Sequence, residues 1–183
     1  MKLATIQHKK ILKPLIKNRI HIADFNHIFD DIEKDYSSLN AAYQFMMNHY
    51  GYKDPPIFCC VVGKISDFRN TKNYKNIILF ELDVPDEFVK LQSFYDWNNI
   101  VWYIENMTRY TRHEPFDEYH RNVLNGLNLD EYGAVFQATI PYINPNWIKH
   151  IYNVDKKFMD LFISGSYLTD PSNYNLKEII CNF

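Results

Sequence analysis

Glycine, cysteine and long apolar runs are all scarce in this chain of 183 residues. Only five residues are glycine, and none forms the glycine-rich loop that cradles phosphate groups. No apolar run approaches about 18 residues, the length that a helix needs to cross a bilayer. The nucleophile elbow of hydrolases and the HExxH motif of zinc proteases are absent as well. We therefore expect a globular chain with no membrane segment and none of the common catalytic motifs.

The three cysteines argue against a disulfide framework and against zinc. Cys59 and Cys60 are neighbours, and neighbouring residues of a strand point to opposite faces, so they rarely bridge each other. An odd count, with Cys181 left over and no CxxC pair, indicates a reducing compartment. Cysteine and histidine are nowhere clustered at the spacing of zinc ligands. The sequence thus predicts a cytoplasmic protein without a bound metal.

Charge is nearly balanced, with a net value of −2 and a sequence pI near 6.4. This balance argues against a strongly basic duplex-binding surface, because phosphate neutralisation dominates such binding. One local exception runs from His8 to Arg19. It is a candidate for a basic groove, although a solvated helix face explains it more simply. The cations of this run are Lys9, Lys10, Lys13, Lys17 and Arg19.

Hydrophobic patterning predicts strands and helices in irregular order. Expected strands cover residues 2–7, 19–23, 57–62, 76–84, 132–143 and 150–154. Expected helices cover residues 9–17, 37–50, 93–106 and 113–124, with a further amphipathic piece at 158–163. Because the two kinds of element do not alternate regularly, an α+β fold is favoured over a doubly wound α/β fold. No repeat or shift of composition marks a second domain, so residues 1–183 are predicted to form one domain.

Two local patterns have a functional and a structural interpretation. His113, Glu114 and His120 share a predicted helix and have the chemistry of an acid–base group, but spacing alone is weak evidence. Trp97 and Trp102 recur at helical spacing with hydrophobic neighbours, which favours core positions over cofactor contacts. From motifs alone, the chain is an α+β domain.

Three segments of the chain carry a resemblance. They are Leu3-Ala4-Thr5-Ile6-Gln7, then residues 80–86 (FELDVPD) with 90–97 (KLQSFYDW), and finally residues 135–140 (VFQATI) with 147–149 (WIK). Together they resemble a bacterial family catalogued only as a domain of unknown function. Their layout in turn looks like the ADP-ribosyltransferase fold, especially its small nucleic-acid-modifying and tRNA phosphotransferase branches.

The resemblance implies split mixed or antiparallel sheets with flanking helices, with a core at residues 1–154 and a C-terminal extension at 155–183. The implied activity is NAD-dependent ADP-ribosyl transfer, with NAD as a substrate and a nucleic acid or a protein as the acceptor. Such a protein would act as a toxin or an anti-phage effector and would have an antitoxin as a further partner. The alternative is a catalytically silent domain of bacterial or phage origin that binds a nucleotide or a protein.

The resemblance also implies a set of NAD-binding residues. Gln7, with Thr5 beside it, falls where the family places its first contact with NAD. Arg69, near Asp67, falls in the loop that would meet the pyrophosphate, and a guanidinium fork suits that task.

The implied catalytic residues are Gln137 and Arg69, while Tyr95 and Trp97 are candidates to stack on nicotinamide. Gln137 stands where the family has a glutamate. Breaking the nicotinamide–ribose bond develops positive charge, which a carboxylate offsets, whereas a glutamine amide only donates and accepts hydrogen bonds. Either Glu131 or another acid substitutes, or the substrate supplies its own base, or the site binds without turnover.

Overall fold

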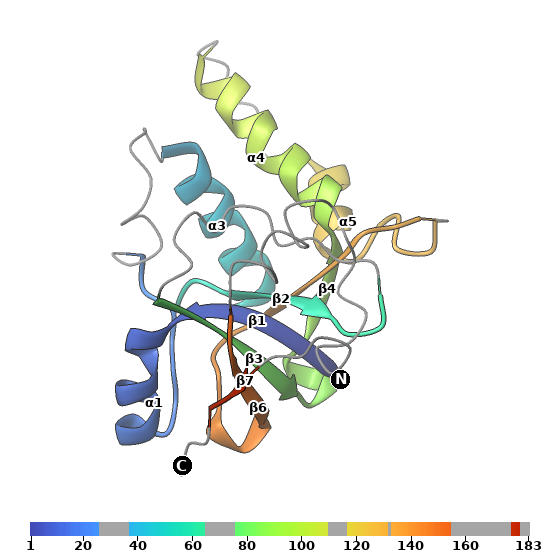
Figure 1. Cartoon of the computed structure of the whole chain (residues 1–183). Coiled ribbons are helices and arrows are strands. Elements are labelled where there is room, and N and C mark those ends of the chain that lie inside the picture. The colour runs from blue at the N-terminus through green and yellow to red at the C-terminus, as the bar shows by residue number, and fades with distance from the viewer. Residues whose placement is uncertain (26–36, 65–75, 110–116, 132, 155–176, 180–183) are drawn as a thin grey trace.

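The computed structural model describes residues 1–25, 37–64, 76–109, 117–131, 133–154 and 177–179 (Figure 1). These residues form seven strands and four α-helices, which confirms the α+β class. The longest of these helices, α4, has 16 residues, and no described helix is both long and apolar enough to cross a bilayer.

All seven strands belong to one antiparallel sheet with the order β4-β5-β2-β1-β3-β6-β7. The expected split into separate sheets is therefore not seen in the described part of the chain. β1 pairs along its whole length with β3 but with β2 only at two positions, Leu3 with Val61 and Ala4 with Cys60. The strands are β1 (Lys2–His8), β2 (Ile57–Val61), β3 (Ile77–Asp83), β4 (Lys90–Ser93), β5 (Phe136–Ile140), β6 (Ile148–Asn153) and β7 (Lys177–Glu178).

Local chemistry explains the start of α1 and the end of α3. Pro14 occupies the first turn of α1, where a missing backbone N–H removes no helix hydrogen bond. Gly51, at φ +70°, ends α3, and the N–H of Tyr52 closes the turn on the carbonyl of Met47. The α-helices are α1 (Leu12–Asn18), α3 (Ser37–Tyr50), α4 (Phe94–Arg109) and α5 (Glu118–Leu124), and the 3-10 turns are η1 (Lys9–Ile11), η3 (Asp86–Phe88) and η4 (Pro145–Trp147).

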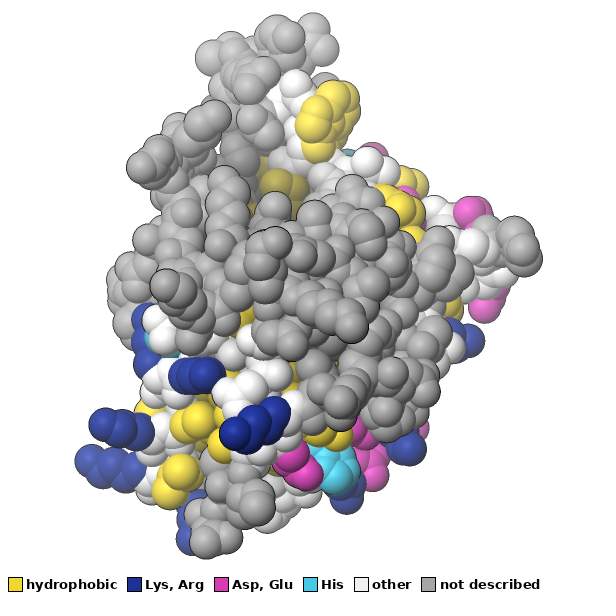
Figure 2. Space-filling model, viewed as in Figure 1, with side chains coloured by type: hydrophobic (Ala, Val, Ile, Leu, Met, Phe, Trp, Pro, Cys, Tyr) yellow, Lys and Arg dark blue, Asp and Glu magenta, His cyan; other side chains and the backbone are white. Residues whose placement is uncertain are grey.

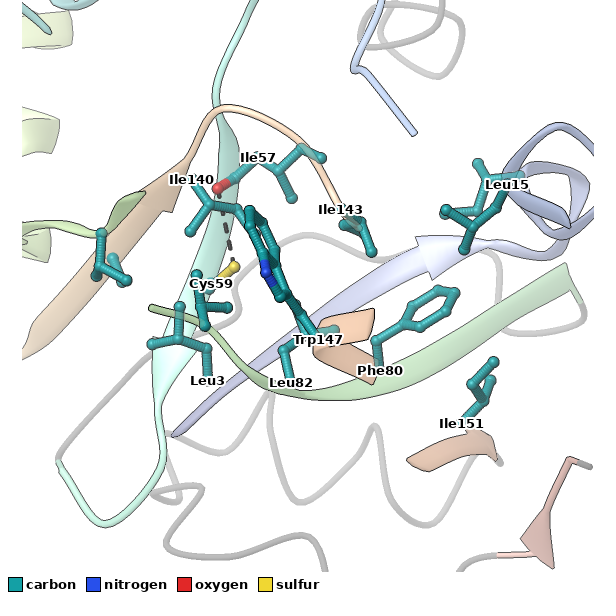
Figure 3. Close-up of a cluster of buried hydrophobic side chains, with 14 of the residues drawn as sticks. Leu3, Leu15, Ile57, Cys59, Phe80, Leu82, Ile140, Ile143, Trp147 and Ile151 are labelled. Carbon is teal, nitrogen blue, oxygen red and sulfur yellow. Dashed lines mark hydrogen bonds between the residues drawn. The ribbon is translucent and has the colours of Figure 1, made fainter. Parts of the chain in front are cut away.

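The sheet buries both of its faces, each under different elements. On the first face, Leu15 of α1 and Trp147 of η4 join strand residues such as Phe80 in one core cluster (Figure 3). On the second face, α3, α4 and α5 pack together over the β2–β5–β4 end, where Phe58 contacts Trp97. This second cluster contains Ala42, Met46, Trp97, Ile100, Ile104, Val123 and Leu124.

The two adjacent cysteines illustrate the alternation of β2. Cys59 lies in the core of the first face and Cys60 in that of the second, and neither forms a disulfide bond. The prediction that they point to opposite faces is therefore confirmed. Burial raises the pKa of the Cys59 thiol to about 12, so this thiol stays protonated and unreactive at neutral pH.

Two strands were not predicted from the sequence. β4 covers only Lys90–Ser93, which the sequence indicated as the approach to a helix. β7 comes from the C-terminal extension and adds two residue pairs to β6, with Glu178 opposite Tyr152 and Lys177 opposite Asn153. The predicted amphipathic piece at 158–163 lies outside the described residues.

Candidate functional site

Thr5 and Gln7 lie on the first face of the sheet. The hydroxyl of Thr5 is fully buried and donates to the carbonyl of Phe58 at 2.8 Å. The amide nitrogen of Gln7 donates to the Thr5 hydroxyl oxygen at 3.0 Å. These two candidate NAD contacts are therefore adjacent, and they bind each other and the neighbouring strand. Asp67 and Arg69 lie outside the described residues.

Gln137 is buried on the second face, beneath α3 and α5. It lies opposite Gln92 in the β4–β5 pair, and the Gln92 side-chain nitrogen donates to the Gln137 side-chain oxygen at 3.0 Å. The Tyr50 hydroxyl shares its proton between the Gln92 side-chain oxygen, at 3.1 Å, and the carbonyl of Leu124. Burial and the neighbouring Tyr52 raise the pKa of Tyr50. Gln137 thus belongs to a buried polar network that links the sheet to α3 and α5.

The structure does not bring Gln7 and Gln137 together. Thr5 pairs with Phe80, and both belong to the first face, as does Gln7 two residues further along β1. Ala138 pairs with Cys59 on that same face, so its neighbour Gln137 points to the other one. Strand β2 is hydrogen-bonded between β5 and β1. A continuous sheet therefore separates the two glutamines.

The two candidate stacking residues on α4 also point apart. Trp97 is 5% exposed and packs edge-on against Tyr43 in the helix cluster. Tyr95 is 50% exposed on the outer side of the helix. The prediction that Trp102 belongs to the core is wrong, because its side chain is 66% exposed. Of the two candidates for stacking on nicotinamide, Trp97 is therefore enclosed by the protein and Tyr95 is accessible.

The outer side of α4, the start of α5 and the loop after it form a surface that the sequence analysis missed. We call it the aromatic–acidic face. Its hydrophobic members are at least one third exposed, and its acidic members are exposed around them (Figure 2, upper right). It consists of Tyr95, Trp102, Tyr119 and Leu127, with Asp117, Glu118, Asp130 and Glu131.

A buried carboxylate anchors the centre of this face. Asp96 is 8% exposed and accepts a hydrogen bond from the side-chain nitrogen of Asn128 at 3.1 Å. Asn128 adopts a left-handed backbone with φ 68°, a conformation that asparagine tolerates. Burial, and then the charge and hydrogen bond of Asp96, raise the pKa of Tyr119. The loop and both helices are thereby held in one arrangement.

The start of α5 is fixed by Asp117 and His120. One carboxylate oxygen of Asp117 accepts from the backbone N–H of His120 at 3.1 Å and contacts its ring nitrogen Nδ1 at 2.6 Å. The backbone hydrogen bond and then the contacts with the His120 ring lower the pKa of Asp117. The His120 ring is buried and lies 4.5 Å from that of Tyr103. This geometry is that of a helix cap, and the other members of the predicted acid–base group, His113 and Glu114, lie outside the described residues.

Comparison with known proteins gives no relative. No protein-family model matches the chain, and no curated protein or solved structure matches it either. In the part of the chain that the structure describes, no three histidine, cysteine or acidic side chains are grouped to hold a metal ion. Any function must therefore be inferred from the residues themselves.

The aromatic–acidic face leaves a clear signal in the sequence. Trp97, Ile100 and Ile104 are buried and follow the spacing of one side of α4. Tyr95 and Trp102 are seven residues apart, so they share the opposite side. A strict helical count would have placed Trp102 outside the core, and an exposed tryptophan is a common mark of an interface.

Proposed function

We propose that the chain is a regulatory protein-binding domain and that the aromatic–acidic face holds a basic segment of a partner protein. The observation that carries this proposal is the exposure of Trp102, 66%, and Tyr95, 50%, on the outer side of a single helix. Tryptophan and tyrosine are enriched among the residues that dominate binding energy at protein interfaces. Their rings stand on a helix that is packed firmly from behind, so little ordering is needed on binding.

The charge of the face selects the chemistry of the partner. Residues 117–131 contain four acidic side chains, all exposed, and a single cation, Arg121. Lysine and arginine side chains are attracted both to such carboxylates and to the faces of tryptophan and tyrosine rings. Acidic residues at the rim also accelerate the encounter with a basic partner. A basic segment that also carries apolar side chains complements both parts of the surface.

The position of Gln137 supports binding rather than turnover. It is uncharged, 9% exposed and engaged by Gln92, whereas a catalytic residue must reach the ribose that it stabilises. The NAD-dependent transferase stays a prediction, and so does a nucleotide-binding regulatory domain. Both are separable from protein binding by experiment.

The proposed partner site is tested with defined peptides. Peptides are selected on the wild-type chain from a random-sequence display library, and their affinities are measured by fluorescence anisotropy. We expect the selected peptides to be rich in lysine and arginine. Trp102→Ala should weaken their binding about 30-fold, the loss typical of an interface hot spot. Ile22→Ala, which truncates an exposed side chain outside the face, is the matched control.

Other results would reject the proposed site or favour one of the two other functions. Peptides without basic enrichment, or equal binding to both variants, would reject the aromatic–acidic face as the site. Labelled NAD is then incubated with the chain and with RNA, DNA and protein acceptors, alongside Arg69→Ala. Label transfer that disappears in this variant would replace our proposal with the transferase. Calorimetric binding of NAD or ADP-ribose without transfer would instead support the nucleotide-binding domain.

A further inference from the structure

Positive charge is concentrated at the start of the chain. The first 23 residues contain six lysine and arginine residues and no acidic residue. The remaining 160 residues hold the other 14 cations and all 22 acids, a balance of −8. The small net charge of the whole chain therefore conceals two regions of opposite sign.

The fold displays most of these cations on one surface. Ile11 and Leu15 lie on the inner side of η1 and α1 and pack into the core of the first face. Lys10, Lys13 and Lys17 are three and four residues apart, so they line up along the outer side, and all are exposed. Arg19, also exposed, follows at the end of α1. We call these four residues the basic face, and Figure 2 shows lysine and arginine side chains gathered at the lower left, where Figure 1 places α1.

This arrangement departs from the charge pattern that favours a helix. Like charges three or four residues apart on a helix repel each other. Neither η1 nor α1 has an acidic residue in its first turn, where the helix dipole favours one. A sequence that breaks local rules on one surface commonly does so for function. A bound polyanion would complement this surface.

We infer that the basic face binds the phosphate backbone of nucleic acid without reading its sequence. Lysine is depleted in protein–protein interfaces, whereas interfaces with nucleic acid are much more positive. Peripheral membrane helices insert their apolar side into the lipid, but Ile11 and Leu15 are committed to the protein core, which leaves Ile16 as the one large hydrophobic side chain that α1 exposes. The chemistry and the burial together favour nucleic acid over a protein or a bilayer.

Binding of this kind depends strongly on salt. Each phosphate that a lysine or arginine neutralises releases counterions, and the affinity for duplex DNA falls with salt accordingly. With three such contacts, the affinity should fall about 40-fold between about 50 and 200 mM salt. The site is therefore expected to be weak at physiological salt and easily measured at low salt.

The test uses the whole chain with two fluorescent probes of mixed sequence, a short duplex DNA and a single-stranded RNA. Lys13→Gln/Lys17→Gln removes two charges while keeping a good helix former at each position. At low salt it should bind about tenfold more weakly or worse, and the slope of log affinity against log salt should fall by about 2. Lys53→Gln/Lys90→Gln removes the same charge elsewhere and should bind like the wild type.

Several results would overturn the inference. They are failure of both probes to bind at low salt, equal binding by the two double variants, and binding only to vesicles that contain phosphatidylserine. Because the basic face and the aromatic–acidic face have opposite charge, sedimentation tests whether copies of the chain bind each other. Loss of self-association in Lys13→Gln/Lys17→Gln, with no change in probe binding, would assign the basic face to a second copy instead. The results with the two nucleic-acid probes do not depend on the partner of the aromatic–acidic face.

Discussion

Gln92 and Gln137 face each other across strands β4 and β5, and the side-chain nitrogen of Gln92 donates to the side-chain oxygen of Gln137 at 3.0 Å. Gln92 is fully buried and Gln137 is 9% exposed. Buried amides are costly unless they are hydrogen-bonded. The pair therefore fixes how the edge of the sheet meets the helices above it.

Removing one partner of this pair should destabilise the fold. We expect Gln137→Ala to lower the free energy of unfolding by about 1–3 kcal/mol, because the Gln92 amide loses its acceptor inside the protein. Gln92→Leu/Gln137→Leu should lose less, since it leaves neither amide of the pair unsatisfied. Urea unfolding followed by circular dichroism measures both. Equal losses in the two variants would show that the hydrogen bond is not what Gln137 contributes.

Restoring the carboxylate expected from the resemblance gives a second prediction. Gln137→Glu places an ionisable group at a buried position, where desolvation favours its neutral form. The variant should be less stable than the wild type at pH 7 and should recover stability as the pH falls and the carboxyl takes up a proton. Urea unfolding at several pH values measures this trend. NAD-dependent labelling gained by Gln137→Glu would instead reveal a catalytic position.

Truncation of the two tryptophans of α4 should change the free energy of unfolding by very different amounts. Trp97→Ala removes a buried ring and should cost about 3–5 kcal/mol of unfolding free energy. Trp102→Ala removes an exposed ring and should change that free energy by about 0.5 kcal/mol or less. Thermal and urea unfolding compare the two directly. A large loss in Trp102→Ala would mean that this residue packs against part of the chain and is not free for a partner.

Local sequence patterns predicted much of the fold. The helix over residues 37–50 and the buried strands β2 and β3 follow from periodicity, from Gly51 and from unbroken apolar runs. β4 has only four residues, and its Gln92 is buried by a partner 45 residues away, which no local pattern reveals. The same reason applies to the candidate site. The face of the sheet on which Gln137 lies depends on strand register, which the sequence does not specify on its own.

Alkaline pH should weaken the fold through Cys59. Burial raises its pKa from 9.0 to about 12, so between these values the unfolded chain loses a proton that the folded chain keeps. Stability is then complete below pH 9 and falls by about 1.4 kcal/mol per pH unit above it. Urea unfolding at pH 8 and at pH 10 measures the loss. Cys59→Val, which lacks the thiol, should show a smaller loss, and an identical loss would exclude Cys59 as its source.

The loop that carries Leu127 and Asn128 depends on Gly126. This glycine has φ +88°, and an added Cβ would lie 2.9 Å from Cδ1 of Leu129. Gly126→Ala should therefore lose more than about 1 kcal/mol of unfolding free energy through backbone strain and crowding. Gly133→Ala is the matched control, because its φ is +81° but nothing lies within 4 Å of the added atom. Equal losses would show that crowding by Leu129 contributes nothing.

The strand order has a consequence for how quickly the chain reaches its final shape. β2 lies between β1 and β5, but β5 begins 75 residues after β2 ends. Contacts between such distant segments form late, because a large loop must close, at a cost in entropy, before the contacts contribute any favourable free energy. During synthesis, one edge of β2 therefore stays unpaired until β5 has left the ribosome. Slow refolding, on a scale of milliseconds to seconds, is the expected signature of this arrangement.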